Sequence, residues 1–471
     1  MRRRDFLHLA AASAVGALVP SRPARVRGVV RSAGKGIAGV AVSDGRTVVG
    51  TASDGTFELV TTSEREFVQI AVPSGYRIPT HPCGTARFYA PVAPEAVFDL
   101  EPLPVSDERH TLLALGDIQT EDREEMGWFH ERSVPDLLET IGRQENRHVV
   151  GLALGDLMFD DLSLYPRYEE SVRRMGVPFF QVIGNHDLDQ EAAVDEDSTR
   201  TFTRHFGPRY ASFDRGAVHY VILDDVFWNG EGYLGYLDAD QLAWLSADLA
   251  LVEKGRTVVV ATHIPLQGSH DVRQGRKKPT PTMSVTNREL LFRLLEPYRV
   301  HVLAGHTHES EHLFHHGLHE HVAGAICGAW WSGPICADGT PNGYAVYDVK
   351  GEEVTWRYKA VGRPEDHQIR VERADDGEIV ANVWDWDPKW EVVLYVDGAR
   401  RGAMERRNGR DPLSVRLHRG PDLPERRKWV EPYVTAHLFF AKPPDGARDV
   451  RVEATDRFGR VSTASIAVGP A

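Results

Sequence analysis

TLLALGDIQTED, residues 111–122, is an apolar run that stops at a glycine and a carboxylate, Gly116 and Asp117. The same form recurs in HVVGLALGD (148–156), FFQVIGNHD (179–187), AVHYVILDD (217–225), TVVVATHIP (257–265) and VHVLAGHTH (300–308). Helical periodicity separates some of these runs, in residues 124–144 and 238–255. Alternating strands and helices predict an α/β core, in which functional sites form beyond the carboxyl ends of the strands.

The segments on both sides of this core have residue patterns that are typical of β-strands. Residues 25–104 alternate short β-branched runs with Asp-Gly turns, which predicts a small β-sandwich that ends in a proline-containing linker. Helix signals vanish from about Glu365, so residues 365–471 are predicted to be a terminal all-β sandwich. The core then spans residues 105–364. In the terminal part a tryptophan row, NVWDWDPKWEV (382–392), either binds carbohydrate or packs one sandwich face.

The N-terminus is typical of an export signal. Arg3 and Arg4 precede an apolar stretch that is too short to be a permanent membrane helix, so residues 1–24 resemble a twin-arginine signal. This predicts a periplasmic or extracellular protein. The sequence predicts no transmembrane helix, and the net charge of −13 disfavours a general nucleic-acid-binding surface. The oligomeric state is left open.

Five strand ends carry the residues that suit a metal centre. They are Asp117 with Gln119, Asp156, the run Asn185-His186-Asp187, His263, and the pair His306 and His308. Carboxylate, amide and imidazole groups together suit Mn²⁺, Fe or Zn²⁺. Adjacent glycines permit tight turns, so that these side chains can converge. One such element alone is weak, because an Asp after a strand is usually a turn or a cap, but five in order indicate a site.

Other polar and aromatic residues have two interpretations each. Asp160 either contacts substrate or caps the next helix, and Trp331 either forms an aromatic wall or packs in the core. His205 could reach the pocket together with Arg204 or Arg209 as a phosphate clamp, although either arginine could instead form a surface salt bridge. Cys327 and Cys336 either form a disulfide or stay as thiols. HESEHLFHHGLHEH (308–321) could hold a third metal ion, but we expect a polar strand face.

The ordered motifs resemble the calcineurin-like metallophosphoesterase superfamily, over about residues 111–359. GNHD at 184–187 and GHTH at 305–308 are the most specific of them. The resemblance implies a four-layer α/β/β/α core with a two-metal site. With its β domains at both ends, the chain looks like exported bacterial members of the superfamily.

The resemblance also implies roles for individual residues. One divalent ion would take Asp117, Gln119 and His308, the other would take Asn185, His263 and His306, and Asp156 would bridge them. Gln119 departs from the family pattern, which has His there, so Gln119 either ligates the metal or holds a metal-bound water.

The implied reaction is hydrolysis of a phosphomonoester or phosphodiester by a hydroxide that bridges the two ions. His186 would stabilise charge or protonate the leaving oxygen, and Asp187 would orient the His186 ring. The substrate would be a phosphorylated small molecule, lipid or glycan. The rival hypothesis is a glycan-binding or cell-surface-binding protein whose phosphoesterase core has decayed.

Overall fold

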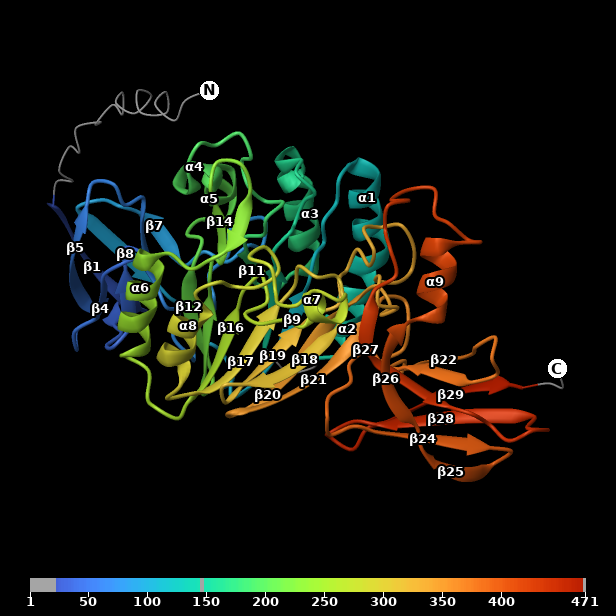
Figure 1. Cartoon of the computed structure of the whole chain (residues 1–471). Coiled ribbons are helices and arrows are strands. Elements are labelled where there is room, and N and C mark those ends of the chain that lie inside the picture. The colour runs from blue at the N-terminus through green and yellow to red at the C-terminus, as the bar shows by residue number, and fades with distance from the viewer. Residues whose placement is uncertain (1–22, 145–147, 469–471) are drawn as a thin grey trace, which may run out of the picture.

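The computed structural model describes residues 23–144 and 148–468. Three pairs of β-sheets follow one another along the chain, in residues 23–99, 109–360 and 370–467 (Figure 1). The predicted signal, residues 1–24, lies almost wholly outside the described residues. Among the described residues, no helix is both long and apolar enough to cross a membrane.

Two central sheets form the middle of the molecule. The first has the order β11-β10-β9-β20-β21 and the second the order β12-β13-β16-β17-β19-β18. The first comprises β11 (Phe179–Val182), β10 (His148–Leu154), β9 (Arg109–Leu115), β20 (Gly343–Lys350) and β21 (Glu353–Ala360). The second comprises β12 (Ala211–Arg215), β13 (Val218–Ile222), β16 (Thr257–Ala261), β17 (Arg299–Ala304), β19 (Leu318–Val322) and β18 (Glu311–His315). All six predicted strand runs are therefore present, as β9, β10, β11, β13, β16 and β17.

The two sheets pack face to face, and helices cover their outer faces. Buried side chains such as Leu152, Phe180, Phe213 and Val259 form one core between the sheets. A second core lies under α1 (Arg123–Trp128), a π-helical turn (Phe129–Ser133), α2 (Val134–Gly142) and α3 (Tyr165–Met175). A third lies under α6 (Ala239–Leu249) and α8 (Arg288–Leu295). The predicted four-layer α/β/β/α arrangement is confirmed. Shorter elements are a 3-10 turn (Leu162–Leu164), α4 (Asp195–Ser198), α5 (Arg200–Phe206), β14 (Val226–Trp228), β15 (Tyr233–Gly235) and α7 (His270–Arg273).

A buried imidazolium ties the second sheet to helix α6. His219 on β13 lies 3.0 Å from Asp214 and 2.9 Å from Asp248. Burial opposes protonation of this ring, but the charges and hydrogen bonds of the two carboxylates raise the pKa of His219 to about 9. His219 is therefore protonated at neutral pH and links β12, β13 and α6.

The N-terminal part is a β-sandwich, as predicted. One sheet contains β2 (Lys35–Gly36), β1 (Pro23–Ser32), β5 (Thr56–Thr62) and β8 (Glu95–Asp99), with β8 parallel to β1. The other contains β4 (Val48–Gly50), β3 (Ala41–Ser43), β6 (Phe67–Ile70) and β7 (Tyr89–Pro91). The sandwich packs against the core, since Val72 bridges Phe213 and Thr85 bridges Phe179.

The C-terminal part is also a sandwich, but it contains a helix that the sequence analysis missed. One sheet contains β22 (Arg370–Arg373), β23 (Ile379–Asn382), β27 (Val434–Ala441) and β26 (Glu405–Arg410). The other contains β25 (Ala399–Ala403), β24 (Glu391–Val396), β28 (Asp449–Thr455) and β29 (Val461–Ala467). Helix α9 (Pro412–Arg419) begins where the Asp411 side chain accepts a hydrogen bond from the Ser414 N–H, with proline in the first turn. The predicted terminal sandwich is therefore present, and α9 is an addition to it that the sequence did not reveal.

Packing explains the tryptophan row of the C-terminal part. Trp384 is fully buried, and Trp386 and Trp390 pack partly buried against the sandwich core. The structure therefore favours the packing interpretation over a carbohydrate-binding row.

The histidine-rich hairpin differs from its prediction. His319 and His321 on β19 are buried, and the His312 side chain is only 4% exposed. The expected polar strand face is therefore wrong for these three residues, which face the space between the central sheets.

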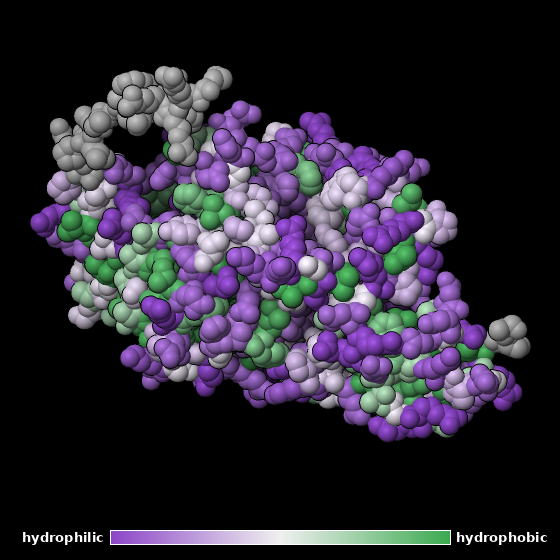
Figure 2. Space-filling view, viewed as in Figure 1, coloured by the Kyte–Doolittle hydropathy of each residue, from purple (hydrophilic) through white to green (hydrophobic). Residues whose placement is uncertain are grey.

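The face of the molecule in Figure 2 is mainly hydrophilic, with scattered hydrophobic residues. This suits a chain in which 26% of residues are charged. Cys327 and Cys336 are both buried and unpaired, so the disulfide alternative is excluded in this structure.

Candidate metal centre

The first ligand loop follows β9 and approaches the loop after β17 closely. The backbone N–H of His306 donates to both carboxylate oxygens of Asp117, at 3.0 and 2.9 Å. A methyl group on Gly305 would lie 2.7 Å from an Asp117 oxygen, so only glycine fits. Asp117 has φ 42° and Gln119 has φ 40°, a left-handed backbone that non-glycine residues adopt at a cost. The backbone of this loop is therefore strained at the two residues whose side chains it places in the cluster.

Asp156 lies at the centre of the cluster. Its carboxylate accepts hydrogen bonds from the His186 N–H at 2.9 Å and from Gln119 Nε2 at 3.1 Å, and lies 3.3 Å from His263 Nε2. One ligand atom each from Asp156, His263 and His306 falls within 4.8 Å of the others. These three side chains can therefore contribute ligands to one metal ion.

Each of the three ligand histidines has one ring nitrogen fixed by a backbone carbonyl. His263 Nδ1 donates at 2.8 Å, His306 Nε2 at 2.9 Å and His308 Nδ1 at 2.7 Å. The acceptors are the carbonyl groups of Leu154, Thr282 and Gly328, respectively. Since the other nitrogen of each ring then faces the cluster, the rings are set as ligands by their outer hydrogen bonds. The Asn185 carbonyl oxygen lies 3.1 Å from His263 Nε2, within the same cluster.

The electrostatics of the cluster favour a cation. Burial raises the pKa of Asp117 to about 8. Burial also works against ionisation of Asp156, but His263 holds the pKa of that carboxyl below its usual range. Among the described residues no Lys or Arg pairs with either carboxylate. Buried carboxylates beside ring nitrogens, with no permanent positive charge, fit divalent metal ions.

Gln119 lies inside the cluster, where its amide nitrogen donates to Asp156. Its carbonyl oxygen lies 4.0 Å from Cys327 Sγ. In this orientation the amide supports the bridging carboxylate. Ligation by Gln119 stays a prediction.

His186 stands at the edge of the cluster, and its orienting partner differs from the expected one. His186 Nδ1 lies 2.7 Å from Asp160 Oδ1, and the ring stacks on Phe159 with centroids 4.4 Å apart. Asp187 instead accepts the N–H groups of Leu157 and Gly184, at 3.1 and 2.9 Å, and the Tyr165 hydroxyl. In this structure Asp160, not Asp187, contacts the His186 ring, while Asp187 connects the loops that carry Leu157 and Gly184.

Two other expected substrate contacts are not part of this cluster. His205 on α5 pairs with Glu169 on α3 at 3.0 Å. Trp331 is buried and donates from Nε1 to the Ile118 carbonyl at 3.0 Å, so it supports the first ligand loop from below. Its neighbour Trp330 is the tryptophan at the site, stacked on His308 with centroids 4.0 Å apart. The sequence pair WW did not show which of the two would turn toward the metal ligands.

Sequence reasoning missed a C-terminal loop, residues 420–433, that reaches the rim of the site. Arg427 pairs with Glu121 at 2.7 Å and with Glu125 at 3.0 Å, and it lies over the Phe159 ring. Trp429 contacts Trp330 in a tilted arrangement with ring centroids 4.7 Å apart, yet 57% of Trp429 is exposed. In Figure 1 this loop passes from α9 toward α1. More than 300 residues separate Arg426 from its partners Asp122 and Glu124, so no local pattern could reveal the contact.

Asp225 is another missed residue, although it ends one of the predicted strands. Its carboxylate accepts the N–H groups of His263 and Ile264, at 3.0 and 3.2 Å. Asp225 therefore fixes the backbone of the fourth ligand loop.

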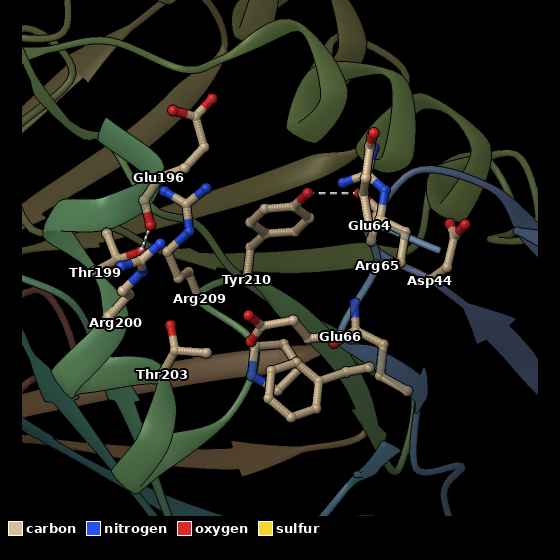
Figure 3. Close-up of a pocket in the computed structure, with 14 residues that line it drawn as sticks. Asp44, Glu64, Arg65, Glu66, Glu196, Thr199, Arg200, Thr203, Arg209 and Tyr210 are labelled. Atoms are coloured by element: carbon tan, nitrogen blue, oxygen red, sulfur yellow. Dashed lines mark hydrogen bonds between the residues drawn. The ribbon is translucent and has the colours of Figure 1, made fainter. Parts of the chain in front are cut away.

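A separate pocket opens between the N-terminal sandwich and helix α5 (Figure 3). Glu64, Arg65, Arg200, Arg209 and Tyr210 are among its lining residues. None of the candidate ligands lines it, and its arginines are paired, Arg209 with Asp224 and Arg65 with Asp240. The candidate metal ligands therefore lie outside this pocket.

Comparison with known proteins agrees with this geometry. Family models match three consecutive segments: the N terminal of calcineurin-like phosphoesterase at residues 24–101, calcineurin-like phosphoesterase at 110–310, and the C terminal of calcineurin-like phosphoesterase at 320–461. Purple acid phosphatase 22 of Arabidopsis thaliana is 28% identical over 148 residues, which are 28% of this chain and 31% of that protein. The chain thus spans about a third of that relative's length.

Solved structures with a similar fold include two phosphatases. A dimetal phosphatase from Danio rerio is 14% identical, with a TM-score of 0.37, over 54% of this chain and 97% of that one. A purple acid phosphatase from yellow lupin (Lupinus luteus) seeds is 14% identical, with a TM-score of 0.39, over 72% of this chain and 67% of that one. Since family models match most of its length, the chain belongs to the calcineurin-like phosphoesterase family.

Proposed function

We propose that the chain hydrolyses a phosphomonoester or phosphodiester of a small molecule, lipid or glycan at the Asp156 cluster. The observation that carries the proposal is the meeting of Asp156, His263 and His306 within 4.8 Å. Bound there, two divalent ions supply a water of lowered pKa and offset the charge of a phosphoryl group. Asp156 sits between the two groups of ligands and suits the bridging position.

His186 is the residue placed to handle the leaving oxygen. Its backbone N–H is held by Asp156, so the ring is fixed relative to the metal ligands. Burial tends to lower the pKa of His186, but Asp156 and Asp160 together raise it above its ordinary value. A protonated imidazole at the cluster edge can donate a proton to the oxygen that departs from phosphorus.

The rim favours a substrate with a flat or ring-shaped part. Trp330 and the exposed Trp429 form an aromatic surface next to His308. Aromatic faces stack on sugar rings and bases alike. Arg427 forms ion pairs with Glu121 and Glu125, so its positive charge is already neutralised. The loop of residues 420–433 therefore offers a substrate aromatic surface rather than free positive charge. The net charge of −13 also supports small substrates over nucleic acid.

Release of nitrophenol tests the proposal, because it reports the cleavage of a monoester and of a diester alike. The metal-reconstituted protein should cleave nitrophenyl phosphate or bis(nitrophenyl) phosphate with Mn²⁺ present, and the ratio of the two rates assigns monoester or diester preference. Asp156→Asn should lose both metal and activity. Full activity in a folded Asp156→Asn protein would contradict the proposed site.

We also infer that the protein is exported through the twin-arginine pathway. Arg3 and Arg4 at the start of an apolar stretch support this. Changing both to Lys should keep the protein in the cytoplasmic fraction of a bacterial host, and unchanged export would contradict the inference.

A further inference from the structure

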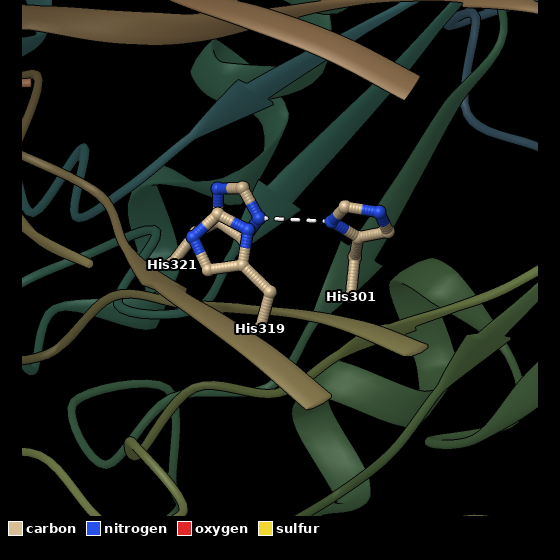
Figure 4. A group of neighbouring side chains, drawn as sticks. All are labelled: His301, His319 and His321. Atoms are coloured by element: carbon tan, nitrogen blue, oxygen red, sulfur yellow. Dashed lines mark hydrogen bonds between the residues drawn. The ribbon is translucent and has the colours of Figure 1, made fainter. Parts of the chain in front are cut away.

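Four histidines face one another between the two central sheets, away from the catalytic ligands. His301 on β17 pairs in register with His319 on β19, and His312 on β18 pairs with His321 on β19. Because register partners share a face of the sheet, all four rings lie on the side that faces Trp356 of the opposite sheet. Figure 4 shows three of these rings, with His319 and His321 in close, tilted contact and His301 beside them.

The ring nitrogens are close enough to share one ion. One nitrogen each from His301, His319 and His321 lies within 4.8 Å of the others. His301 Nδ1 is 3.0 Å from His321 Nε2, and His312 Nδ1 is 3.0 Å from His319 Nε2. Two nitrogens bound at about 2.0 Å to a tetrahedral Zn²⁺ lie about 3.3 Å apart, so small ring rotations suffice.

Without an ion the cluster is incompletely satisfied. His321 Nδ1 is buried and has no hydrogen-bond partner among the described residues. The other nitrogen of this ring, Nε2, faces His301 Nδ1, so among the described residues no carboxylate or carbonyl oxygen holds either nitrogen of His321. Buried polar groups are usually satisfied in native proteins, so the protein alone satisfies this ring poorly.

The protonation state of the cluster suits a metal. Burial lowers the pKa of His301 to about 4 and also lowers the pKa values of His319 and His321. Burial therefore favours the neutral form of these three rings, which is the form of histidine that binds metals.

A carboxylate outside the cluster completes the pattern. His312 Nε2 donates to Asp385 at 2.8 Å, so His312 Nδ1 is left free to face His319. A ligand histidine whose second nitrogen donates to a carboxylate is the usual arrangement around Zn²⁺. The nearby cation, Arg457, is paired with Asp387 at 2.6 Å, which leaves one net negative charge beside the cluster.

We propose that His301, His319 and His321, with His312 as the fourth ligand, bind a first-row transition-metal ion such as Zn²⁺, separate from the catalytic pair. Ligands that are all neutral nitrogen favour Zn²⁺ and exclude Mg²⁺ or Ca²⁺, which prefer oxygen. The ion joins β17, β18 and β19 and, through Asp385, connects them to the C-terminal sandwich.

Zinc content of the full chain tests the site. After equilibration with Zn²⁺ and removal of excess, elemental analysis should find about one ion per chain in Asp156→Asn/His263→Ala, whose catalytic centre is disabled. His321→Gln in that background should hold almost none. His316→Gln is the matched control, because His316 lies in the same hairpin but is exposed.

A second variant guards against misfolding. Asp385→Asn keeps all four histidines and should weaken zinc binding about 10-fold to 100-fold. Co²⁺ in the catalytic-centre variant should show the visible absorption of a tetrahedral ion, and His321→Gln should abolish it. A folded catalytic-centre variant that retains no zinc and shows no such absorption would overturn the proposal, whether or not the wild-type enzyme is active.

Discussion

Replacing Asp160 by Asn separates the charge of this residue from its shape. The carboxylate contacts His186 Nδ1 at 2.7 Å, and hydrogen bonds to a charged partner are about twice as strong as neutral ones. Loss of the charge therefore costs about 1 kcal/mol, and solvent reduces this because 43% of the Asp160 side chain is exposed. At about 1.4 kcal/mol for each tenfold change, kcat should fall about threefold to fivefold.

The pH profile and the leaving group reveal how the loss arises. Asp160 favours protonated His186, so in Asp160→Asn the alkaline limb of kcat should move to lower pH. Alkyl phosphates need a proton on the departing oxygen more than nitrophenyl phosphates do, so their hydrolysis should suffer more. Phosphate release is measured for both substrates at equal metal content.

Asp161→Asn is the matched control for this experiment. Asp161 is adjacent and exposed, and its side chain only accepts the Ser163 N–H at 3.1 Å, so kcat should not change. Equal losses for alkyl and nitrophenyl substrates in Asp160→Asn, with an unmoved pH profile, would refute the reasoning that Asp160 acts through the His186 ring.

Three further predictions concern other parts of the molecule. Gly184→Ala should lose metal and activity while staying folded, because the added methyl would lie 2.0 Å from the Asp156 nitrogen; full metal content would contradict this. The folded-state pKa of His219 exceeds the unfolded value of 6.5, so the stability from this ring is complete below pH 6.5 and is lost as pH rises through about 9. The free energy of unfolding of the wild type, measured with urea, should therefore be about 3 kcal/mol lower at pH 9 than at pH 6. His219→Gln should not show this difference. Trp429→Ala should raise KM about twofold to tenfold for ring-containing substrates at constant kcat, and an unchanged KM would remove Trp429 from the binding surface.

The sequence predicted the core and its ligand cluster because both follow from local patterns. An apolar run predicts a strand, and the glycine that follows it predicts a tight turn. The carboxylate or imidazole after that glycine is then a candidate ligand at the end of the strand. The order of the layers then brings the strand ends together. For this reason Asp117, Asp156, His263 and His306 could be named before any coordinates were known.

The partners of those residues depend on contacts across the fold. Asp160 and Asp187 lie at similar places in their loops, and only the path of each backbone decides which one meets the His186 ring. His301 joins the histidine cluster through strand register, which the spacing of HESEHLFHHGLHEH could not show. Helix α9 was missed because eight residues within a long β region give a weak periodic signal.

The loop of residues 420–433 has a consequence for how such enzymes diversify. Its aromatic and basic side chains border the reacting centre, yet they are encoded in a different part of the chain from every metal ligand. Substitutions in this loop can therefore alter which molecules are accepted while the hydrolytic machinery stays intact. Removing the terminal sandwich would take away one wall of the proposed binding site, so the shortened protein should keep the ions at the Asp156 cluster and lose its selectivity.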